Sequence, residues 1–283
     1  MTTKALPDET IGKAKLRIVM DGPLYRGAVI RQGKTGQVFE DADLDRLRHR
    51  LREEAGKSDP HYWGYDGAIQ RFRQFFPKGF QDKAYLQSER SYKVKAAKTL
   101  AATLPVEGAL EASASDAAAI AKVVGLTNLL AHQHEQQQMR SLLSGPEGKE
   151  FVRAAAQFAL GEAATALPKM NALSRAVGRI SWPVATYLPF LWCPESQMFL
   201  KPEVTKDYAA RVAHDFAQRY EADLTIEVYT SLLDLVVETE KNLTSLKPAD
   251  RIDVQSFIWV VGKYGAEELP SDDELALRAG PPS

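Results

Sequence analysis

Apolar side chains recur every three or four residues along most of the chain after residue 41, and this spacing predicts a mainly α-helical protein. Leu44, Leu47 and Leu51 lie on one face of the first predicted helix. Asp41 or Asp43 can cap that helix, because a carboxylate before the first turn accepts from free backbone N–H groups. The same spacing predicts further helices over residues 64–76, 82–104, 111–130, 149–167, 205–220, 225–246 and 250–262.

The first 41 residues carry a different pattern, in which short apolar runs are separated by glycine-containing turns. The runs at 16–20, 28–31 and 37–40 flank turns at 21–23 and 32–36. Such runs on both sides of a glycine turn are typical of a hairpin. We therefore predict a small antiparallel β-hairpin or three-stranded sheet near the N-terminus, which makes the fold α+β overall. Residues 1–14 are polar, and we expect them to fray.

Residues 182–202 interrupt the helical pattern because four prolines occur there among aromatic residues. Proline lacks a backbone N–H and restricts the residue before it, so repeated prolines prevent one long helix. The segment is nevertheless strongly apolar. We therefore predict a buried, irregular or kinked stretch that crosses the core.

The composition of the chain changes near residues 105–112, from basic and aromatic to alanine-rich. We therefore predict a basic region with the small sheet over residues 1–105 and a helical core domain over residues 110–268. Residues 269–283 are predicted to be a disordered acidic tail. Because no flexible linker marks the boundary, the first two parts can share an interface.

The bulk composition is that of an ordinary globular protein, since 45% of the 283 residues are hydrophobic and 26% are charged. The single cysteine, Cys193, excludes an internal disulfide and a four-cysteine zinc site, which fits a reducing compartment. The N-terminus has no apolar signal-peptide core, and no apolar stretch approaches the roughly 20 residues that a membrane helix needs. These features predict a cytoplasmic protein without a membrane partner.

The net charge of −1 conceals an asymmetry along the chain. Residues 1–110 contain 20 basic and 14 acidic residues, whereas the remainder contains 16 and 23. The excess is greatest between Arg46 and Lys98, where there are 13 basic and 6 acidic residues. Such a split predicts that the basic part of the chain meets an anion.

Aromatic residues are interleaved with basic ones between His61 and Lys98. Nine of the 25 aromatic residues of the chain lie there, namely Tyr62, Trp63, Tyr65, Phe72, Phe75, Phe76, Phe80, Tyr85 and Tyr92. Nucleic acids offer phosphates to cations and flat bases to aromatic rings, so this stretch meets the chemical requirement for binding them. The alternative is that the rings are core, and the helical spacing of Ile69, Phe72 and Phe76 favours core packing for those three.

The candidate site residues follow from this interpretation. Those selected for nucleic-acid binding are Arg46, Arg50, Tyr62, Trp63, Tyr65, Arg71, Arg73, Lys78, Arg90 and Lys93. Arg31 and Lys34 flank the tip of the predicted hairpin and are candidate anion-binding residues. Lys201 is another, because it precedes a predicted helix start, where backbone N–H groups attract anions.

No pattern in the sequence predicts a catalytic residue, a metal ion or a cofactor. His132, His134 and Glu135 resemble metal ligands, but the two histidines, at positions i and i+2 of a helix, do not share a face. Asp82, Glu89 and Lys93 do share a helical face, which leaves two interpretations open. They form either a magnesium site for phosphodiester cleavage or an ordinary Glu–Lys pair that stabilises the helix. Serine-nucleophile and paired-cysteine zinc patterns are absent from the sequence.

Two blocks in the C-terminal third, Met198–Lys206 and Ile252–Val260, resemble segments of uncharacterised bacterial proteins. The resemblance implies a bacterial cytosolic setting and assigns no catalytic residue. Within the second block, Gln255 and Ser256 interrupt an otherwise apolar helix. We expect them to take part in an internal polar contact, such as a satisfied pair within the core.

Three functions remain open at this point. The first, which we favour, is a non-catalytic module associated with DNA or RNA. The second is a helical interaction or regulatory protein whose basic face docks an acidic partner or a second copy of the chain. The third is an enzyme that acts on a phosphate-bearing substrate near residues 182–202. An enzyme of this kind needs a concave pocket in which two or more acids converge with a lysine or a histidine.

Overall fold

The computed structural model describes residues 4–57, 61–173 and 178–269. Its contacts divide the chain into two compact units, each made of two segments. Unit 1 consists of Met1–Arg71 and Glu203–Tyr220, and unit 2 consists of Phe72–Pro202 and Glu221–Ser283. One helix, α2 (Gly64–Phe75), contributes residues to both units.

The composition change near residues 105–112 does not coincide with the division into units, because both sides of it belong to unit 2. The basic helix before it, α4 (Ser91–Thr103), packs on the alanine-rich helix α6 (Ala114–Ala121) that follows it. The change in composition thus lies at a contact between two helices of the same unit, α4 and the alanine-rich α6. Of the predicted tail, only Leu269 belongs to the described residues.

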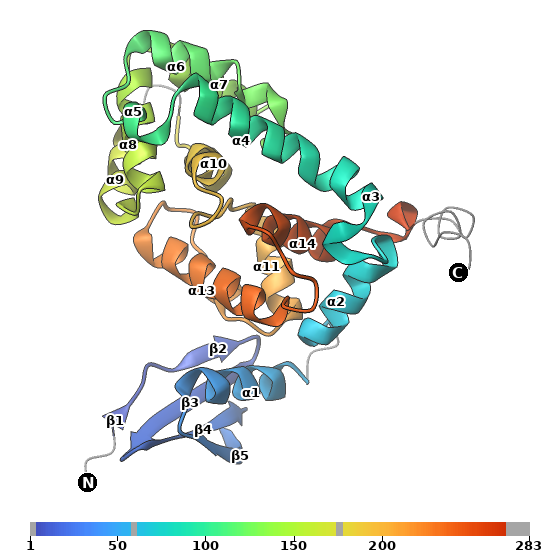
Figure 1. Ribbon diagram of the computed structural model, residues 1–283. Helices are drawn as coiled ribbons and strands as arrows, with labels where there is room; N and C mark the ends of the chain where they lie inside the picture. Colours follow the sequence, from blue (N-terminus) through green and yellow to red (C-terminus); the bar gives the residue numbers. More distant parts are fainter. Residues whose placement is uncertain (1–3, 58–60, 174–177, 270–283) are drawn as a thin grey trace, which may run out of the picture. The chain divides into compact units, whose positions relative to one another are not determined.

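Unit 1 contains a five-stranded antiparallel sheet, which confirms the predicted N-terminal sheet. Its strands are β1 (Lys4–Ala5), β2 (Glu9–Ile11), β3 (Ala14–Asp21), β4 (Leu24–Arg31) and β5 (Lys34–Asp41). Strands β3, β4 and β5 form a meander, and both β1 and β2 pair with β3 (Figure 1). The two hairpin turns place Gly22, Gln32 and Gly33 at positive φ (63°, 50° and 77°), as two-residue turns require.

Strands β1 and β2 are the part of the sheet that the sequence pattern does not reveal. Ile11 is paired with Ala14 of β3 and is buried. Glu9 is also buried, and its carboxylate is 3.0 Å from the Arg52 guanidinium. The prediction that residues 1–14 fray is therefore wrong for residues 4–5 and 9–11. A three-residue strand with a buried carboxylate carries too little apolar signal to be recognised.

Helix α1 (Leu44–Gly56) packs on β3, β4 and β5, as the leucine spacing predicts. The carboxylate of Asp43 caps it by accepting from the backbone N–H of Asp45 at 2.9 Å. Leu47 and Leu51 are buried in the core cluster between the helix and the sheet. The helix can approach closely because β4 has glycine at Gly27, where a Cβ atom would lie 2.5 Å from the Leu51 side chain.

The second segment of unit 1 supplies α11 (Pro202–Arg211) and α12 (Phe216–Arg219). Ala213, between these helices, joins the core cluster of the sheet and α1. Helix α11 begins at Pro202 rather than at residue 205, where the helix was predicted to begin, because the fixed φ of proline suits the first helical position.

Unit 2 is helical in its described residues. Its remaining α-helices are α3 (Lys83–Tyr85), α5 (Val106–Ala109), α7 (Glu135–Ser144), α8 (Gly148–Ala159), α9 (Ala163–Leu173), α10 (Trp182–Trp192), α13 (Ile226–Asn242) and α14 (Arg251–Lys263). Shorter turns are η1 (Gly79–Gln81), the π-helical η2 (Leu86–Arg90), η3 (Val124–Leu126) and η5 (Ala266–Glu268). The predicted fold class, mainly α with a small N-terminal antiparallel sheet, is confirmed. None of the helices in the described part of the chain is long and apolar enough to cross a membrane.

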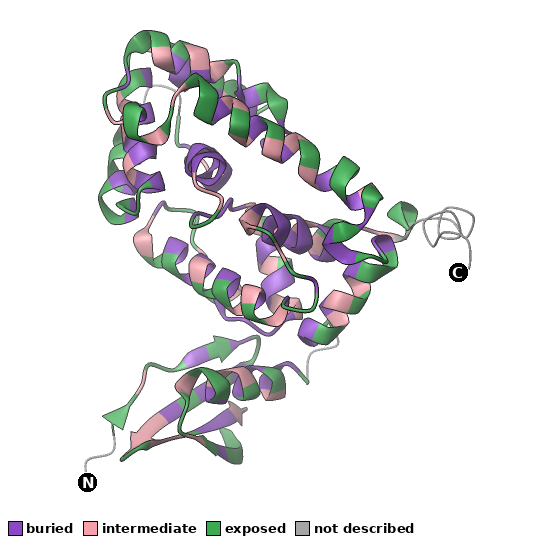
Figure 2. Ribbon diagram, viewed as in Figure 1, coloured by how far each residue is buried: buried purple, intermediate pink, exposed green. Residues whose placement is uncertain are grey.

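Helix α10 is the proline-rich segment, and every one of its residues is buried (Figure 2). It packs against α4, α7 and α8. Pro183 lies in the first turn, where backbone N–H groups have no partner within the helix, so the N–H that proline lacks is not needed there. Pro189 lies within the helix. The prediction of burial is confirmed, but most of the segment is a regular helix because the prolines occur mainly at helix starts and after helix ends.

The aromatic rings between Phe72 and Tyr85 form a cluster in the interior of unit 2. Phe72 lies at the centre, with ring centroids 5.3 Å from Phe76, 5.1 Å from Phe80 and 5.8 Å from Tyr85. Helix α14 adds Phe257, whose centroid is 5.2 Å from that of Phe72. The core interpretation is therefore confirmed for these rings.

Candidate functional site

Two of the candidate cations of unit 1 are engaged by residues of the same unit. Arg46 Nη2 lies 2.8 Å from Asp41 Oδ1, and this contact holds the pKa of the Asp41 carboxyl below its ordinary value. The Arg50 guanidinium lies over the Phe39 ring, 4.4 Å from its centroid. Both cations are exposed, so they can still meet an anion, but in competition with these contacts.

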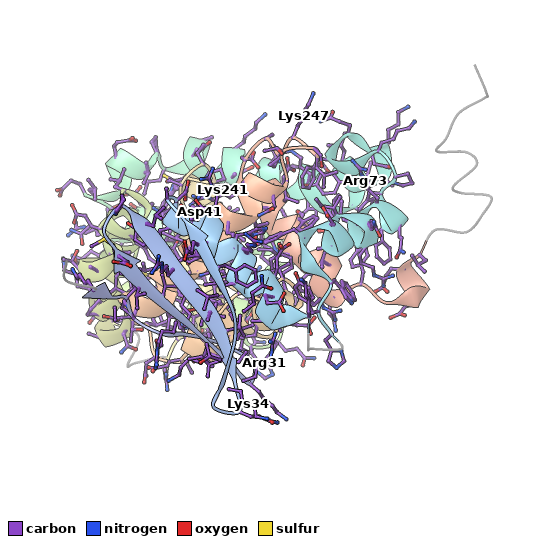
Figure 3. The ribbon with its side chains drawn as sticks, turned by 90° about the horizontal axis from the view of Figure 1, so that it is seen from below. Arg31, Lys34, Asp41, Arg73, Lys241 and Lys247 are labelled. Carbon is purple, nitrogen blue, oxygen red and sulfur yellow. The ribbon has the colours of Figure 1, made fainter. Side chains whose placement is uncertain are left out.

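The hairpin between β4 and β5 carries the next two candidates. Arg31 donates a hydrogen bond to the backbone carbonyl of Glu54, near the C-terminus of α1. Lys34 lies at the tip of the hairpin, is exposed, and makes no ion pair with the described residues (Figure 3). The sequence therefore places Lys34 correctly at the turn, whereas Arg31 ties the turn to α1.

The three candidate stacking residues of unit 1 do not form an open aromatic surface. Tyr65 is 5% exposed. Trp63 is half-buried, and the Arg211 guanidinium covers its ring at 3.9 Å from the centroid. Tyr62 is half-buried, and its burial raises its pKa to about 12. Base stacking needs a free ring face, and little of any face of these three rings is free. A further candidate cation, Arg71 of α2, is half-buried.

In unit 2, Arg73 and Lys78 are exposed and make no ion pair with the described residues. The turn that carries Lys78 packs against a second turn, because a Cβ at Gly79 would lie 3.0 Å from the Leu246 side chain. The next residue, Lys247, is exposed and points away from the ribbon (Figure 3). Sequence reasoning missed Lys247, since no local pattern brings the two turns together.

A shallow hollow of about 470 Å³ lies along α4, and we call it the α4 hollow. The residues that line it are Ser91, Val94, Lys95, Lys98, Thr99 and Ala102. Its two lysines are exposed and make no ion pair with any residue in the described ranges. The hollow therefore presents two ammonium groups on one helix face without an acidic residue in its described wall.

Arg90 has a different environment, because it forms ion pairs with the N-cap residue of α14 and with an acid in the first turn of that helix. Its guanidinium lies 2.7 Å from Asp250 Oδ2 and 2.7 Å from Asp253 Oδ1. Tyr85 also donates to Asp253 Oδ1, and its burial and that carboxylate raise its pKa, which keeps the phenol protonated. Arg90 is thus a structural link between η2 and α14, with both charge partners fixed.

Lys93 is 1% exposed and lies at the centre of a buried polar cluster. Its Nζ donates to Glu89 Oε2 at 3.1 Å and to Ser256 Oγ at 2.8 Å. Glu89 also accepts from Tyr264 Oη at 2.7 Å. Burial lowers the pKa of Lys93, while the adjacent carboxylate opposes that shift. Lys93 is therefore buried against α14 rather than placed on the outer surface of the protein. Local sequence patterns do not reveal this, because Ser256 lies 163 residues away in the chain.

The magnesium interpretation of this helix face finds no ligand cluster. Asp82 caps α3 by accepting from the backbone N–H of Ala84 at 2.9 Å, and both Glu89 oxygens accept from the partners given above. In the described part of the chain, no group of three His, Cys, Asp or Glu side chains could hold a metal ion. The predicted Glu–Lys pair exists, but it is buried rather than solvated.

A cavity of about 270 Å³ adjoins this cluster, and we call it the Lys93 cavity. Its lining comprises Glu89, Tyr92, Lys93, Asn128, Leu129, Ala131, Phe199, Lys201, Gln255 and Trp259. The π-helical η2 supplies Glu89, α4 supplies Lys93, and α14 supplies Gln255. Glu89 is the one acid among these lining residues, so the two converging acids that an enzyme of phosphate esters requires are not found there.

Lys201 lines the same cavity and is half-buried. Its Nζ lies 2.7 Å from Glu135 Oε2, at the start of α7. That carboxylate also accepts from the backbone N–H of Ala131 at 2.7 Å. The anion that Lys201 meets in the structure is thus Glu135, a contact between segments that no local pattern reveals.

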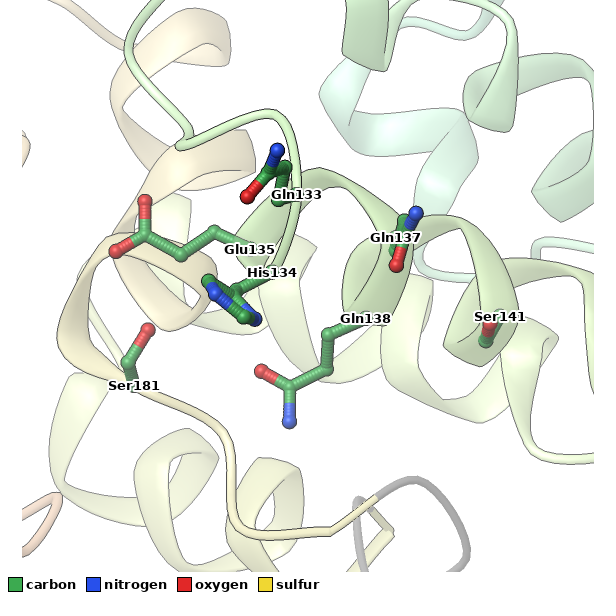
Figure 4. Close-up of a pocket in the computed structure, with 7 residues that line it drawn as sticks. All are labelled: Gln133, His134, Glu135, Gln137, Gln138, Ser141 and Ser181. Carbon is green, nitrogen blue, oxygen red and sulfur yellow. The ribbon is translucent and has the colours of Figure 1, made fainter.

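A larger and more open hollow of about 700 Å³ lies at the beginning of α7 (Figure 4). His134, Gln138 and Ser181 line it. Gln138 is engaged, because its Nε2 donates to the Arg179 carbonyl at 3.0 Å. The titratable residues among those that line this hollow are His134, which is exposed, and Glu135, whose carboxylate pairs with Lys201. The described lining therefore brings no set of catalytic or ligand-binding groups together.

Comparison of the chain with family models, with curated proteins and with solved structures finds no match. The geometry of the two units is therefore the basis for the functional argument.

Proposed function

We propose that the chain is a non-catalytic nucleic-acid-associated protein that contacts phosphate through exposed cations of unit 2. The α4 hollow carries the proposal, because Lys95 and Lys98 line it together and none of its described lining residues is acidic. Such ammonium groups gain from phosphate contact by releasing counterions from the nucleic acid. Arg73 and Lys78 are exposed in the same unit and supply further contacts.

Phosphate, rather than base, is the proposed point of contact. The rings that base stacking would use are buried or covered, as Tyr65 and Trp63 illustrate. Phosphate contacts position a protein on DNA or RNA but carry no sequence information. The expected binding is therefore strongly salt-dependent, weakly dependent on sequence, and open to DNA and RNA alike.

Fluorescence anisotropy with labelled single-stranded and double-stranded oligonucleotides tests the proposal. The double variant Lys95→Gln/Lys98→Gln removes the charge of the α4 hollow. For duplex DNA, the slope of log K against log salt should then become shallower by about 1.8, which is two contacts at about 0.9 each. The control is Lys122→Gln/Lys149→Gln, which removes the same charge from other helices of unit 2 and should leave the slope unchanged.

Two results would contradict the proposal. The first is the absence of binding to DNA and RNA at about 50 mM salt, where phosphate contacts are strong. The second is an equal loss in both double variants, which would show that net charge rather than the α4 hollow matters. Capture of an acidic protein by the wild-type chain, lost only in the Lys95→Gln/Lys98→Gln variant, would assign the same lysines to a protein partner instead.

A further inference from the structure

The Lys93 cavity combines an aromatic wall with a few fixed polar groups. Phe199 is buried, and Tyr92 and Trp259 are half-buried at its edge. This combination is the usual form of small-molecule sites, which measure roughly 300–1,000 Å³. At about 270 Å³, the cavity suits a compact ligand.

The charged groups of the cavity are already balanced. Lys93 is paired with Glu89 at 3.1 Å, and Lys201 is paired with Glu135 at 2.7 Å. An anionic ligand would be repelled by the Glu89 and Glu135 carboxylates, with which it would compete for the two lysines, and water screens such repulsion poorly in a buried cavity. A cationic ligand would be repelled by the ammonium groups of Lys93 and Lys201. The balance therefore favours a neutral ligand.

Two polar groups of the cavity retain unused hydrogen-bonding capacity. Gln255 is 5% exposed, and its Oε1 has no hydrogen-bond partner among the described residues. A buried acceptor of this kind is destabilising unless something donates to it. Lys93 Nζ has three N–H donors, and Glu89 and Ser256 use two of them. The lining of the cavity thus includes an unmet acceptor on Gln255 and a lysine with one further N–H, whose Nζ lies 5.4 Å from the centroid of the Tyr92 ring.

We propose that the Lys93 cavity binds a small, flat, neutral heterocycle in which a ring N–H stands beside a carbonyl, as on the lactam and imide edges of nucleobases. The ring N–H donates to Gln255 Oε1, and the carbonyl accepts from Lys93 Nζ. The ring face packs on the aromatic wall of Tyr92, Phe199 and Trp259. This site is independent of phosphate binding, because the Lys93 cavity and the α4 hollow share no lining residue.

Calorimetric titration of the full chain with uracil and with 1,3-dimethyluracil tests the ligand class. Both probes are flat and carry the same two carbonyls, but methylation removes both ring N–H groups. We expect uracil to bind and 1,3-dimethyluracil to bind about tenfold more weakly or not at all. Equal affinities for the two probes, or no binding of uracil at millimolar concentration, would overturn the proposal.

The variant Gln255→Met tests the acceptor, because it keeps an unbranched side chain of similar length and removes the amide. We expect about tenfold weaker uracil binding with an unchanged or higher Tm, since an unpartnered buried oxygen is lost. The matched control is Gln197→Met. The Gln197 amide accepts from Tyr229 Oη at 2.8 Å and donates to the Ala159 carbonyl at 2.9 Å, so its loss should lower the Tm and leave uracil affinity unchanged.

A lower Tm with full uracil affinity in Gln255→Met would show that the amide is structural, and the proposal would then be wrong. Failure of uracil to bind would leave the nucleic-acid proposal untouched, because that proposal is tested with the Lys95→Gln/Lys98→Gln variant. Conversely, uracil binding with no oligonucleotide binding would support the Lys93 cavity and contradict the phosphate surface.

Discussion

Cations from one short stretch of the sequence have two kinds of surroundings in unit 2. Arg90 and Lys93 face α14, where Asp250, Asp253 and Ser256 hold them, and we call these two the inward set. Lys95 and Lys98, two and five residues after Lys93, are exposed in the α4 hollow, and we call them the outward set. Their partners explain the difference. Asp250, Asp253 and Ser256 lie 160 or more residues away from the cations that they engage, so a count of basic residues overestimates the surface that can meet an anion.

The two sets should also differ in what they contribute to stability. An exposed ammonium group is solvated in the folded and unfolded states alike, so its removal changes the free energy of unfolding little. A buried cation has lost its water, and its partner carboxylate depends on it for compensation. Removal of one member of a buried pair therefore leaves an uncompensated charge in the interior.

The largest effect is expected for Lys93→Met, which keeps most of the side-chain volume and removes the ammonium group. The buried Glu89 carboxylate then retains only the hydroxyl of Tyr264 among the donors given above. We expect a loss of about 3–5 kcal/mol in the free energy of unfolding, measured by urea denaturation at neutral pH.

A second substitution sharpens this result. In Lys93→Met/Glu89→Gln the carboxylate is neutral, so the double variant should recover a substantial part of the loss. If the single variant loses less than about 1 kcal/mol, which is the range of exposed ion pairs, the inward set would not differ energetically from the outward set.

An intermediate effect with a defined pH dependence is expected for Tyr264→Phe. At about pH 7 the variant should lose about 1.5–3 kcal/mol, the contribution of a hydrogen bond to a charged acceptor such as Glu89. Burial and the Glu89 carboxylate raise the pKa of Tyr264 above its ordinary value. Above about pH 10 the unfolded tyrosine loses its proton while the folded one keeps it, so the wild-type chain loses stability as pH rises.

The phenylalanine variant has no such proton to lose. The difference between the two proteins should therefore narrow above about pH 10, which urea denaturation at about pH 7, 9 and 11 can measure. A difference that stays constant or widens over this range would show that Tyr264 titrates normally in the folded state.

The elements of the fold that follow from short-range patterns were predictable. The leucine spacing of α1 depends on residues three or four positions apart, and the glycine turns of the β3–β5 meander depend on adjacent residues. Strands β1 and β2 were missed, because they are two and three residues long and depend on pairing with β3. Helix α10 was predicted as buried but not as regular, since a proline in the first turn is compatible with a helix.

The candidate site was less predictable because its chemistry depends on distant contacts. The spacing of Glu89 and Lys93 identified a pair, but only α14 makes that pair a buried cluster through Ser256. Gln255 and Ser256 were expected to form an internal polar contact, which is confirmed for Ser256, while Gln255 Oε1 lacks a partner among the described residues. Lys201 was placed at a helix start, yet its partner is Glu135 of α7. No local sequence pattern contains these pairings.

The smallest effect on stability, and the clearest test of the outward set, is expected for Lys95→Gln/Lys98→Gln. Both side chains are exposed and make no ion pair with the described residues, so the free energy of unfolding should change by less than about 0.5 kcal/mol. Glutamine also suits a helix nearly as well as lysine, which keeps α4 intact. A larger loss, measured by urea denaturation alongside the wild-type chain, would show that these lysines have structural partners and that the outward set does not exist as a free surface. An unchanged stability together with weakened oligonucleotide binding would separate function from folding on one helix, because Lys95 and Lys98 lie only two and five residues after Lys93, whose removal is expected to cost about 3–5 kcal/mol.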